Sequence, residues 1–110
     1  MEIVFRTKKL AQTFNSASAL RKTYGERMAR TIMMRLAVLR DASNLSIVPV
    51  LPPNRRHQLQ GKRAGQYAVD LIHPYRLIFE PADILARKVG SEENTDEVTA
   101  ITIIEVIDYH

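Results

Sequence analysis

The sequence predicts a small α+β domain in which an antiparallel sheet packs on a pair of helices. Two observations lead to this fold class. Apolar residues recur at helical spacing through the first 40 residues, and short alternating or continuous apolar runs, typical of strands, follow from residue 67 onward. The expected order is strand, helix, helix and then a three-stranded antiparallel meander. At 110 residues, the chain (1–110) is expected to form a single domain around one core.

The first part of the chain is predicted to hold a strand and two helices. Residues 2–5 (EIVF) suit a short strand, and Thr7 is placed to cap the first helix. That helix is expected to continue to residue 20, with an apolar face of Leu10, Phe14, Ala17 and Leu20. A second helix is expected over residues 23–40, with Arg27, Arg30 and Arg35 mostly directed away from the core.

The second part is predicted to supply most of the sheet. Residues 46–54 contain three prolines, which excludes them from a central strand, and residues 55–66 form a polar, basic loop. Residues 67–72 and 75–80 are expected to form a hairpin around the His73–Pro74 turn. Residues 83–97 suit a long acidic loop, and residues 98–107 suit a central strand because their apolar run is nearly continuous.

Composition excludes several classes of protein. The chain has no cysteine, so it has no disulfide, thiolate nucleophile or cysteine-based zinc site. It lacks an apolar signal core and any stretch of roughly 20 apolar residues that could span a membrane. We therefore expect a soluble cytoplasmic protein with no membrane partner.

The charge is distributed unevenly along the chain. Through Phe79 there are 14 Lys and Arg against 4 Asp and Glu, a net charge of +10, whereas from Glu80 onward 2 basic residues face 8 acidic ones, a net charge of −6. The basic part is a candidate for binding a polyanion. The alternative is that these cations only solvate helix surfaces.

Common nucleotide and metal motifs are absent. The sequence contains no G-x-x-x-x-G-K-[ST], no G-x-G-x-x-G and no H-E-x-x-H. Its three histidines, His57, His73 and His110, do not have the spacing of metal ligands. We therefore expect no metal site.

Chemically versatile residues gather where two predicted strands end. In an antiparallel meander, Arg76 lies beside the end of the last strand, which is followed at once by Asp108, Tyr109 and His110. With His57 from the basic loop, this set offers two imidazoles for proton transfer and a guanidinium for a phosphate. Metal-free RNA cleavage needs such groups, because the 2′-hydroxyl loses a proton, the leaving oxygen gains one and negative charge accumulates at phosphorus.

Other cations are expected to support phosphate binding, but each residue also has a simpler interpretation. Arg56, Lys62 and Arg63 lie in the basic loop near His57. Lys62 and Arg63 are otherwise solvated turn residues, and His57 is otherwise an exposed loop histidine. Arg76 otherwise pairs with Asp108 or Glu80 on the sheet.

Taken together, the motifs resemble a known family. They are His57 followed by a leucine and Gly61-Lys62, then residues 65–69 (GQYAV), residues 75–79 (YRLIF) and the ending DYH. This combination resembles the HigB branch of the RelE/ParE superfamily, the toxins of type II toxin–antitoxin modules. The resemblance spans nearly the whole chain and implies a RelE-like, microbial-ribonuclease-like fold.

The resemblance also implies a function. It implies a ribosome-dependent mRNA endonuclease that cuts in the A site without a metal or other cofactor, leaves a 2′,3′-cyclic phosphate and is silenced by a HigA-like antitoxin. His57 falls on the family's loop histidine, Arg76 on its phosphate-binding arginine, and Asp108, Tyr109 and His110 on its C-terminal catalytic trio. The acidic stretch 83–97 and the Pro-rich stretch 49–53 depart from the family pattern.

Two other functions remain open from the sequence. A ParE-like inhibitor of DNA gyrase would share the fold and would not need the histidines. A non-catalytic module that only binds an antitoxin would also retain the fold.

Overall fold

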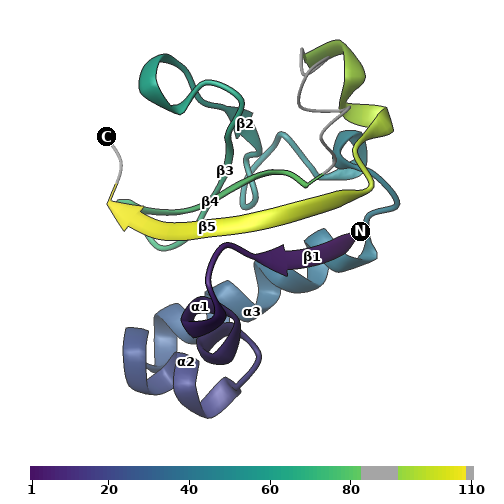
Figure 1. Cartoon of the computed structure of the whole chain (residues 1–110). Helices are drawn as coiled ribbons and strands as arrows, with labels where there is room; N and C mark the ends of the chain where they lie inside the picture. Colours follow the sequence, from purple (N-terminus) through teal and green to yellow (C-terminus); the bar gives the residue numbers. More distant parts are fainter. Residues whose placement is uncertain (83–91, 109–110) are drawn as a thin grey trace.

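In the computed structural model, residues 1–82 and 92–108 are described. The elements follow the order β1 (Glu2–Phe5), α1 (Lys8–Phe14), α2 (Ala17–Tyr24), α3 (Glu26–Asp41), β2 (His57–Gln58), β3 (Tyr67–Asp70), β4 (Tyr75–Pro81) and β5 (Ala100–Asp108) (Figure 1). Short 3-10 turns are η1 (Leu45–Ile47), η2 (Gly61–Arg63) and η3 (Glu92–Glu97). The predicted α+β class is confirmed.

The strands form a mixed five-stranded sheet in the order β1-β5-β4-β3-β2. As predicted, β3, β4 and β5 form an antiparallel meander. Strand β1 joins its edge in parallel to β5, with Glu2 opposite Ala100. The two-residue strand β2 was not predicted, and it pairs His57 with Ala68 on β3. Strand β5 is therefore paired on both sides, which fits its apolar sequence.

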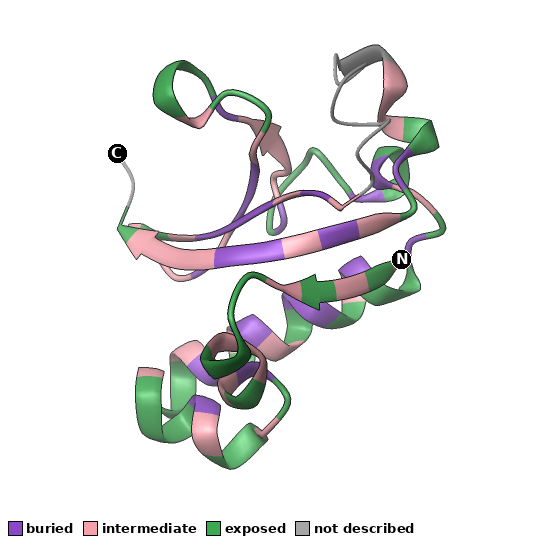
Figure 2. Cartoon of the chain, viewed as in Figure 1, coloured by how far each residue is buried: buried purple, intermediate pink, exposed green. Residues whose placement is uncertain are grey.

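The helices cover one face of this sheet and bury the main core against it (Figure 2). Strand residues alternate between the two faces, so every second residue of β3 and β4 points at the helices. The buried side chains of this core include Ile32, Leu36 and Leu39 from α3 and Tyr67, Val69, Leu77, Phe79, Ile101 and Ile103 from the sheet. This arrangement leaves the other face of the sheet available for a site.

The prediction of two helices was wrong, because the first one breaks after Phe14. The hydroxyl of Ser16 accepts a hydrogen bond from the Ala19 N–H, 3.1 Å away, and thereby begins a new helix. Gly25 then separates α2 from α3 with φ of 87°, a conformation that favours glycine. The helical layer is consequently three short segments.

A second, smaller apolar cluster lies on the face of the sheet away from the helices. Its buried members are Leu59, Ala68, Ile78 and Ile104, and Ile107 packs against them. Leu59 comes from the loop after β2, so this cluster holds that loop on the sheet. It forms an apolar base for the polar groups described below.

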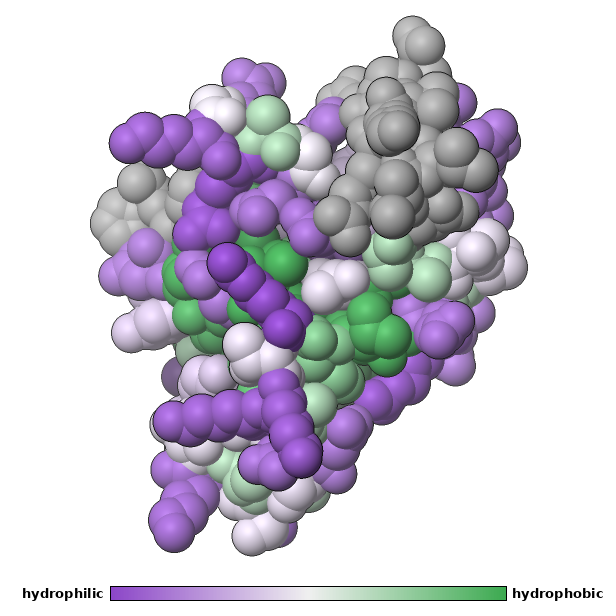
Figure 3. Space-filling view, viewed as in Figure 1, coloured by the Kyte–Doolittle hydropathy of each residue, from purple (hydrophilic) through white to green (hydrophobic). Residues whose placement is uncertain are grey.

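The connecting segments agree in part with the prediction where they are described. In the predicted connection 46–54, residues 46–47 belong to the 3-10 turn η1 and the rest contains no helix or strand, whereas the predicted loop 55–66 contains β2 and η2. The acidic stretch ends in the 3-10 turn η3, and residues 83–91 of that predicted loop lie outside the described residues. Hydrophilic side chains project from the helical end of the molecule and hydrophobic ones gather at the level of the sheet (Figure 3). None of the described helices is long and apolar enough to cross a membrane.

Candidate functional site

The residues predicted to act on RNA come mainly from the sheet face that lies away from the helices. Residues paired across strands share a face, which aligns His57, Ala68, Ile78 and Glu105 in one row. The next row on that face contains Asp70, Arg76 and Ile107. His57 and Arg76 are thus two strands and one row apart, or roughly 12 Å between Cα atoms at ideal strand spacings.

Arg76 lies beside the end of β5, as predicted. It is opposite Ile107, and the preceding Tyr75 is opposite Asp108. Because successive strand residues alternate between faces, Asp108 begins on the face opposite to Arg76. Asp108 is exposed at the strand end. Tyr109 and His110, the other members of the predicted trio, lie outside the described residues.

His57 occupies a defined position on strand β2. Its Nδ1 lies 2.8 Å from the carbonyl oxygen of Arg55. Its Nε2 is buried and has no hydrogen-bond partner within the described part of the chain. The ring lines a hollow of about 420 Å³ together with Val50, Arg56, Gln58, Tyr67 and Thr95. The interpretation of His57 as an exposed loop residue is therefore wrong, since the ring is partly buried and held at one nitrogen.

Asp70 gathers three arginine side chains around it. Arg55 binds its carboxylate through two contacts, Nε to Oδ2 at 2.6 Å and Nη2 to Oδ1 at 3.1 Å. The Nε atom of Arg76 lies 3.5 Å from Oδ1. On the helix side, Arg35 donates from Nε to the backbone carbonyl of Asp70 over 2.6 Å. Asp70 therefore holds Arg55 and Arg76 through its carboxylate and Arg35 through its backbone carbonyl.

The position of Arg35 differs from the one predicted from the helical pattern. It was predicted to face mostly away from the core, but only 8% of its surface is exposed. Burial lowers the pKa of Arg35 and the charge of Asp70 opposes that shift. For Arg55, the hydrogen bond from its guanidinium to Asp70 raises the pKa. Both side chains therefore remain cationic at neutral pH.

The basic residues near His57 differ in what they already bind. Arg56 donates from Nε to the carbonyl of Val48 at 3.0 Å, and within residues 1–82 and 92–108 it forms no salt bridge. Lys62 is exposed on η2. Arg63 binds Glu105 on β5, with Nη2 2.8 Å from Oε1. Arg63 therefore ties η2 to the sheet and is neither a merely solvated turn residue nor an uncompensated cation.

Sequence reasoning missed Asp70 and Arg55. Asp70 is the only acidic residue between Asp41 and Glu80, and it interrupts the apolar run YAVDLI within the basic part of the chain. A single carboxylate in a half-buried strand indicates that a cation lies nearby, because burying an unpaired charge is costly. The partner could not be chosen from the sequence, since several arginines are available.

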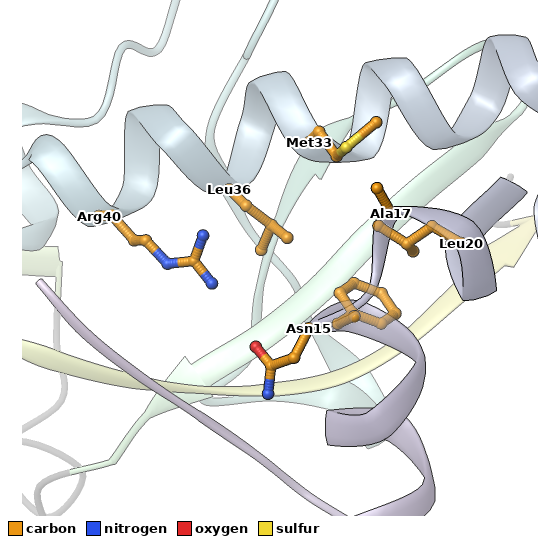
Figure 4. Close-up of a pocket in the computed structure, with 7 residues that line it drawn as sticks. Asn15, Ala17, Leu20, Met33, Leu36 and Arg40 are labelled. Carbon is orange, nitrogen blue, oxygen red and sulfur yellow. The ribbon is translucent and has the colours of Figure 1, made fainter.

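A second cleft, of about 320 Å³, lies among the three helices (Figure 4). Met33 and Leu36 from α3 and Leu20 from α2 form an apolar wall, and the Arg40 and Asn15 side chains lie together at one end. The cleft offers no imidazole or carboxylate for proton transfer. Among residues 1–82 and 92–108, no three His, Asp or Glu side chains lie close enough together to hold a metal.

Comparison with known proteins identifies solved structures with a similar fold. No protein-family model matches the chain, and no curated protein is significantly similar to it in sequence. Among solved structures, the YoeB-YefM complex from Staphylococcus aureus matches with a TM-score of 0.57 and 14% identity, covering 100% of this chain and 97% of the other. The YoeB/ParE toxin from Agrobacterium tumefaciens matches with a TM-score of 0.54 and 13% identity, covering 100% of both chains.

These likenesses extend over the whole chain and include the order of helices and the five-stranded sheet. The resemblance to the RelE/ParE superfamily is confirmed at the level of the fold, whereas the HigB branch in particular stays a prediction. The chain has the fold of the RelE/YoeB-like toxins.

Proposed function

We propose that this protein is the toxin of a type II toxin–antitoxin module and that it cleaves mRNA on the ribosome. The observation that favours catalysis is the geometry of His57, whose Nδ1 is held by a carbonyl while Nε2 has no partner in the described part of the chain. Arg76 lies on the same sheet face. An imidazole held at one nitrogen, on the same sheet face as a guanidinium, suits proton transfer in the neighbourhood of a phosphate.

In the proposed reaction, a base removes the proton of the ribose 2′-hydroxyl. The 2′-oxygen then attacks the adjacent phosphorus, the bond to the 5′-oxygen breaks, and an acid protonates that oxygen. The products are a 2′,3′-cyclic phosphate and a free 5′-hydroxyl, and neither a metal nor another cofactor is needed. His57 and His110 share the acid and base roles, and Arg76 neutralises the charge that develops on the phosphate.

The remaining predicted residues support this chemistry. Asp108 orients an imidazole or helps to deprotonate the 2′-hydroxyl, and Tyr109 stacks on a base of the A-site codon. Arg56 and Lys62 contact the backbone of the RNA, while Arg63 positions the loop that carries Lys62. These few groups cannot by themselves hold a flexible RNA in the reactive geometry. We therefore expect the ribosome to supply much of the alignment of the RNA.

The proposed partners follow from the same function. The solved YoeB-YefM complex shares this fold. We propose that an antitoxin binds and silences this chain, and the sequence predicts that this antitoxin is HigA-like. Action on translating ribosomes would place the protein in the cytoplasm.

Induced expression in a bacterial host tests the proposal. Wild type, His57→Ala and His110→Ala are compared, and the 5′ ends of cellular mRNA are mapped. We expect wild type to arrest growth and to create in-frame cuts, and each variant to slow cleavage by about 10²- to 10⁴-fold, the usual contribution of a general acid or base. Lys22→Gln is the control, because this exposed side chain lies on α2, in the helical layer and away from the proposed site.

A ParE-like inhibitor of DNA gyrase is the second candidate, since the Agrobacterium tumefaciens structure with this fold is a YoeB/ParE toxin. In that case both histidine variants would stay toxic, mRNA would remain intact and gyrase supercoiling would be inhibited by the purified protein. Antitoxin binding with no growth arrest would instead indicate a non-catalytic module.

A further inference from the structure

Arg55, two residues before His57, has an unusual backbone conformation. Its φ is 47°, and it is the only non-glycine residue with positive φ in the described part of the chain. Such a left-handed conformation is unfavourable for a residue with a Cβ atom. It persists only where surrounding contacts hold it.

Three contacts of Arg55 supply that support. Its backbone N–H donates to the carbonyl of Leu51 over 2.9 Å. Its guanidinium binds both carboxylate oxygens of Asp70, at 2.6 and 3.1 Å. Asp70 is itself fixed, because its N–H donates to the carbonyl of Asn54 and β3 pairs it with Arg76. The side chain of Arg55 is thus anchored to the end of β3.

The conformation of Arg55 determines what its carbonyl contacts at His57. The carbonyl of Arg55 lies 2.8 Å from Nδ1 of His57, and a carbonyl oxygen can only accept a hydrogen bond. Nδ1 must therefore carry a proton. Nε2 is buried without a partner among the described residues, so a second proton there would be an unsatisfied buried donor. The geometry selects the neutral tautomer with the proton on Nδ1 and a lone pair on Nε2.

We propose that Arg55 is a positioning residue that sets the tautomer of His57. Asp70 holds the Arg55 guanidinium, the left-handed backbone directs the Arg55 carbonyl at Nδ1, and the lone pair of the His57 ring is left on Nε2. This rests on the proposed function and deepens it, because it names Nε2 as the nitrogen of His57 that carries the lone pair. Asp70 also contacts Arg76, so one carboxylate orients both Arg55 and the phosphate-binding cation.

Nuclear magnetic resonance tests the tautomer without any assay of activity. The protein is made by cell-free synthesis with ¹⁵N-labelled histidine, and two-bond ¹H–¹⁵N correlations are recorded above the pKa of imidazole. His57→Gln assigns the signal by its loss. We expect wild-type His57 to carry its proton on Nδ1. A proton on Nε2 in the wild type would overturn the proposal, whatever the outcome of the mRNA cleavage experiment.

Variants then test the route from Asp70 through Arg55. In Asp70→Asn and in the milder Arg55→Lys, which cannot bind both oxygens, we expect a mixture of tautomers. Glu105→Gln is the matched control, because it removes another arginine–carboxylate pair on the same sheet face and should keep the Nδ1–H tautomer. Amide spectra confirm which variants are folded, and a single Nδ1–H tautomer in folded Arg55→Lys would contradict the proposal.

Cleavage rates supply the second readout for the same variants. We expect mRNA cleavage by Arg55→Lys to slow by about tenfold to a hundredfold, less than loss of the imidazole itself, since the imidazole remains available part of the time. A wild type with the Nδ1–H tautomer but no nuclease activity would refute the proposed function and leave the positioning role of Arg55 intact.

Discussion

At the scale of single residues, Asp70 links parts of the chain that are far apart in sequence. Arg35 comes from α3, Arg55 from the connection before β2 and Arg76 from β4, and each contacts Asp70. The carboxylate is partly exposed, so each ion pair alone is worth little. Its larger effect is to offset the mutual repulsion of the guanidinium groups that gather around it in a half-buried site.

Replacing this carboxylate tests its contribution to stability. We expect Asp70→Asn to lower the free energy of unfolding by about 1–3 kcal/mol, since Arg55 loses the carboxylate that it binds through two contacts and buried Arg35 loses a nearby negative charge. Glu26→Gln is the control, because it removes exposed ion pairs to Arg21 and Arg30 and should cost less than about 1 kcal/mol. Urea denaturation at neutral pH measures both, and equal losses would contradict this account of Asp70.

At the scale of elements, the helical layer is divided by hydroxyl caps. Thr7 accepts a hydrogen bond from the Leu10 N–H at 3.0 Å, and Ser16 accepts one from the Ala19 N–H at 3.1 Å. Each cap satisfies an N–H that has no partner within its helix. Since α1 and α2 have only seven and eight residues, neither would be stable without these caps and the packing of Phe14 and Leu20.

The caps give a prediction of their own. Thr7→Ala and Ser16→Ala should each destabilise the protein by about 1 kcal/mol, the usual value of a hydroxyl N-cap. Thr31→Ala is the matched control, because the Thr31 hydroxyl bonds to the Arg27 carbonyl one turn earlier inside α3 and caps nothing. Thermal unfolding followed by circular dichroism compares the three. A loss in Thr31→Ala as large as in the cap variants would argue against the capping role.

At the scale of the whole molecule, basic groups lie on both sides of the sheet. The helical layer contributes cations such as Lys22, whereas Arg56 lines the hollow with His57 and Lys62 lies on η2 in the loop between β2 and β3. Charge by itself therefore does not identify the RNA-binding side. The two sides differ in another feature: the side away from the helices carries the small apolar cluster together with His57, Arg76 and the Asp70 cluster.

Salt dependence distinguishes the two sides experimentally. Binding to a short RNA with 2′-O-methyl groups, which block cleavage, should weaken with salt as counterions are released. Removing one phosphate contact should reduce the log–log slope by about 0.7. We expect that change for Lys62→Gln and none for Lys22→Gln, measured by fluorescence anisotropy. The reverse result would place the RNA on the helical side and would contradict the proposed site.

Much of this architecture was predictable from local patterns. The period of the apolar residues located α3 and strands β1, β3, β4 and β5, because side chains must match the repeat of the backbone that carries them. The position of Arg76 beside the end of β5 followed from the meander. The helix break at Ser16 was also encoded locally, but Ser16 was read as part of a continuing helix because Ala17 and Leu20 extended its apolar spacing.

What the sequence by itself determined is the α+β class, the central position of β5 and the pairing of β4 with it, since these depend on apolar periodicity and short connections. Only the tertiary structure decided that Asp70 binds Arg55 and Arg76, that Arg35 is buried, and that the Arg55 carbonyl holds His57. The physical reason is that periodicity specifies which face a side chain occupies, whereas the choice among many arginines for one carboxylate depends on distances that exist only after the sheet has formed.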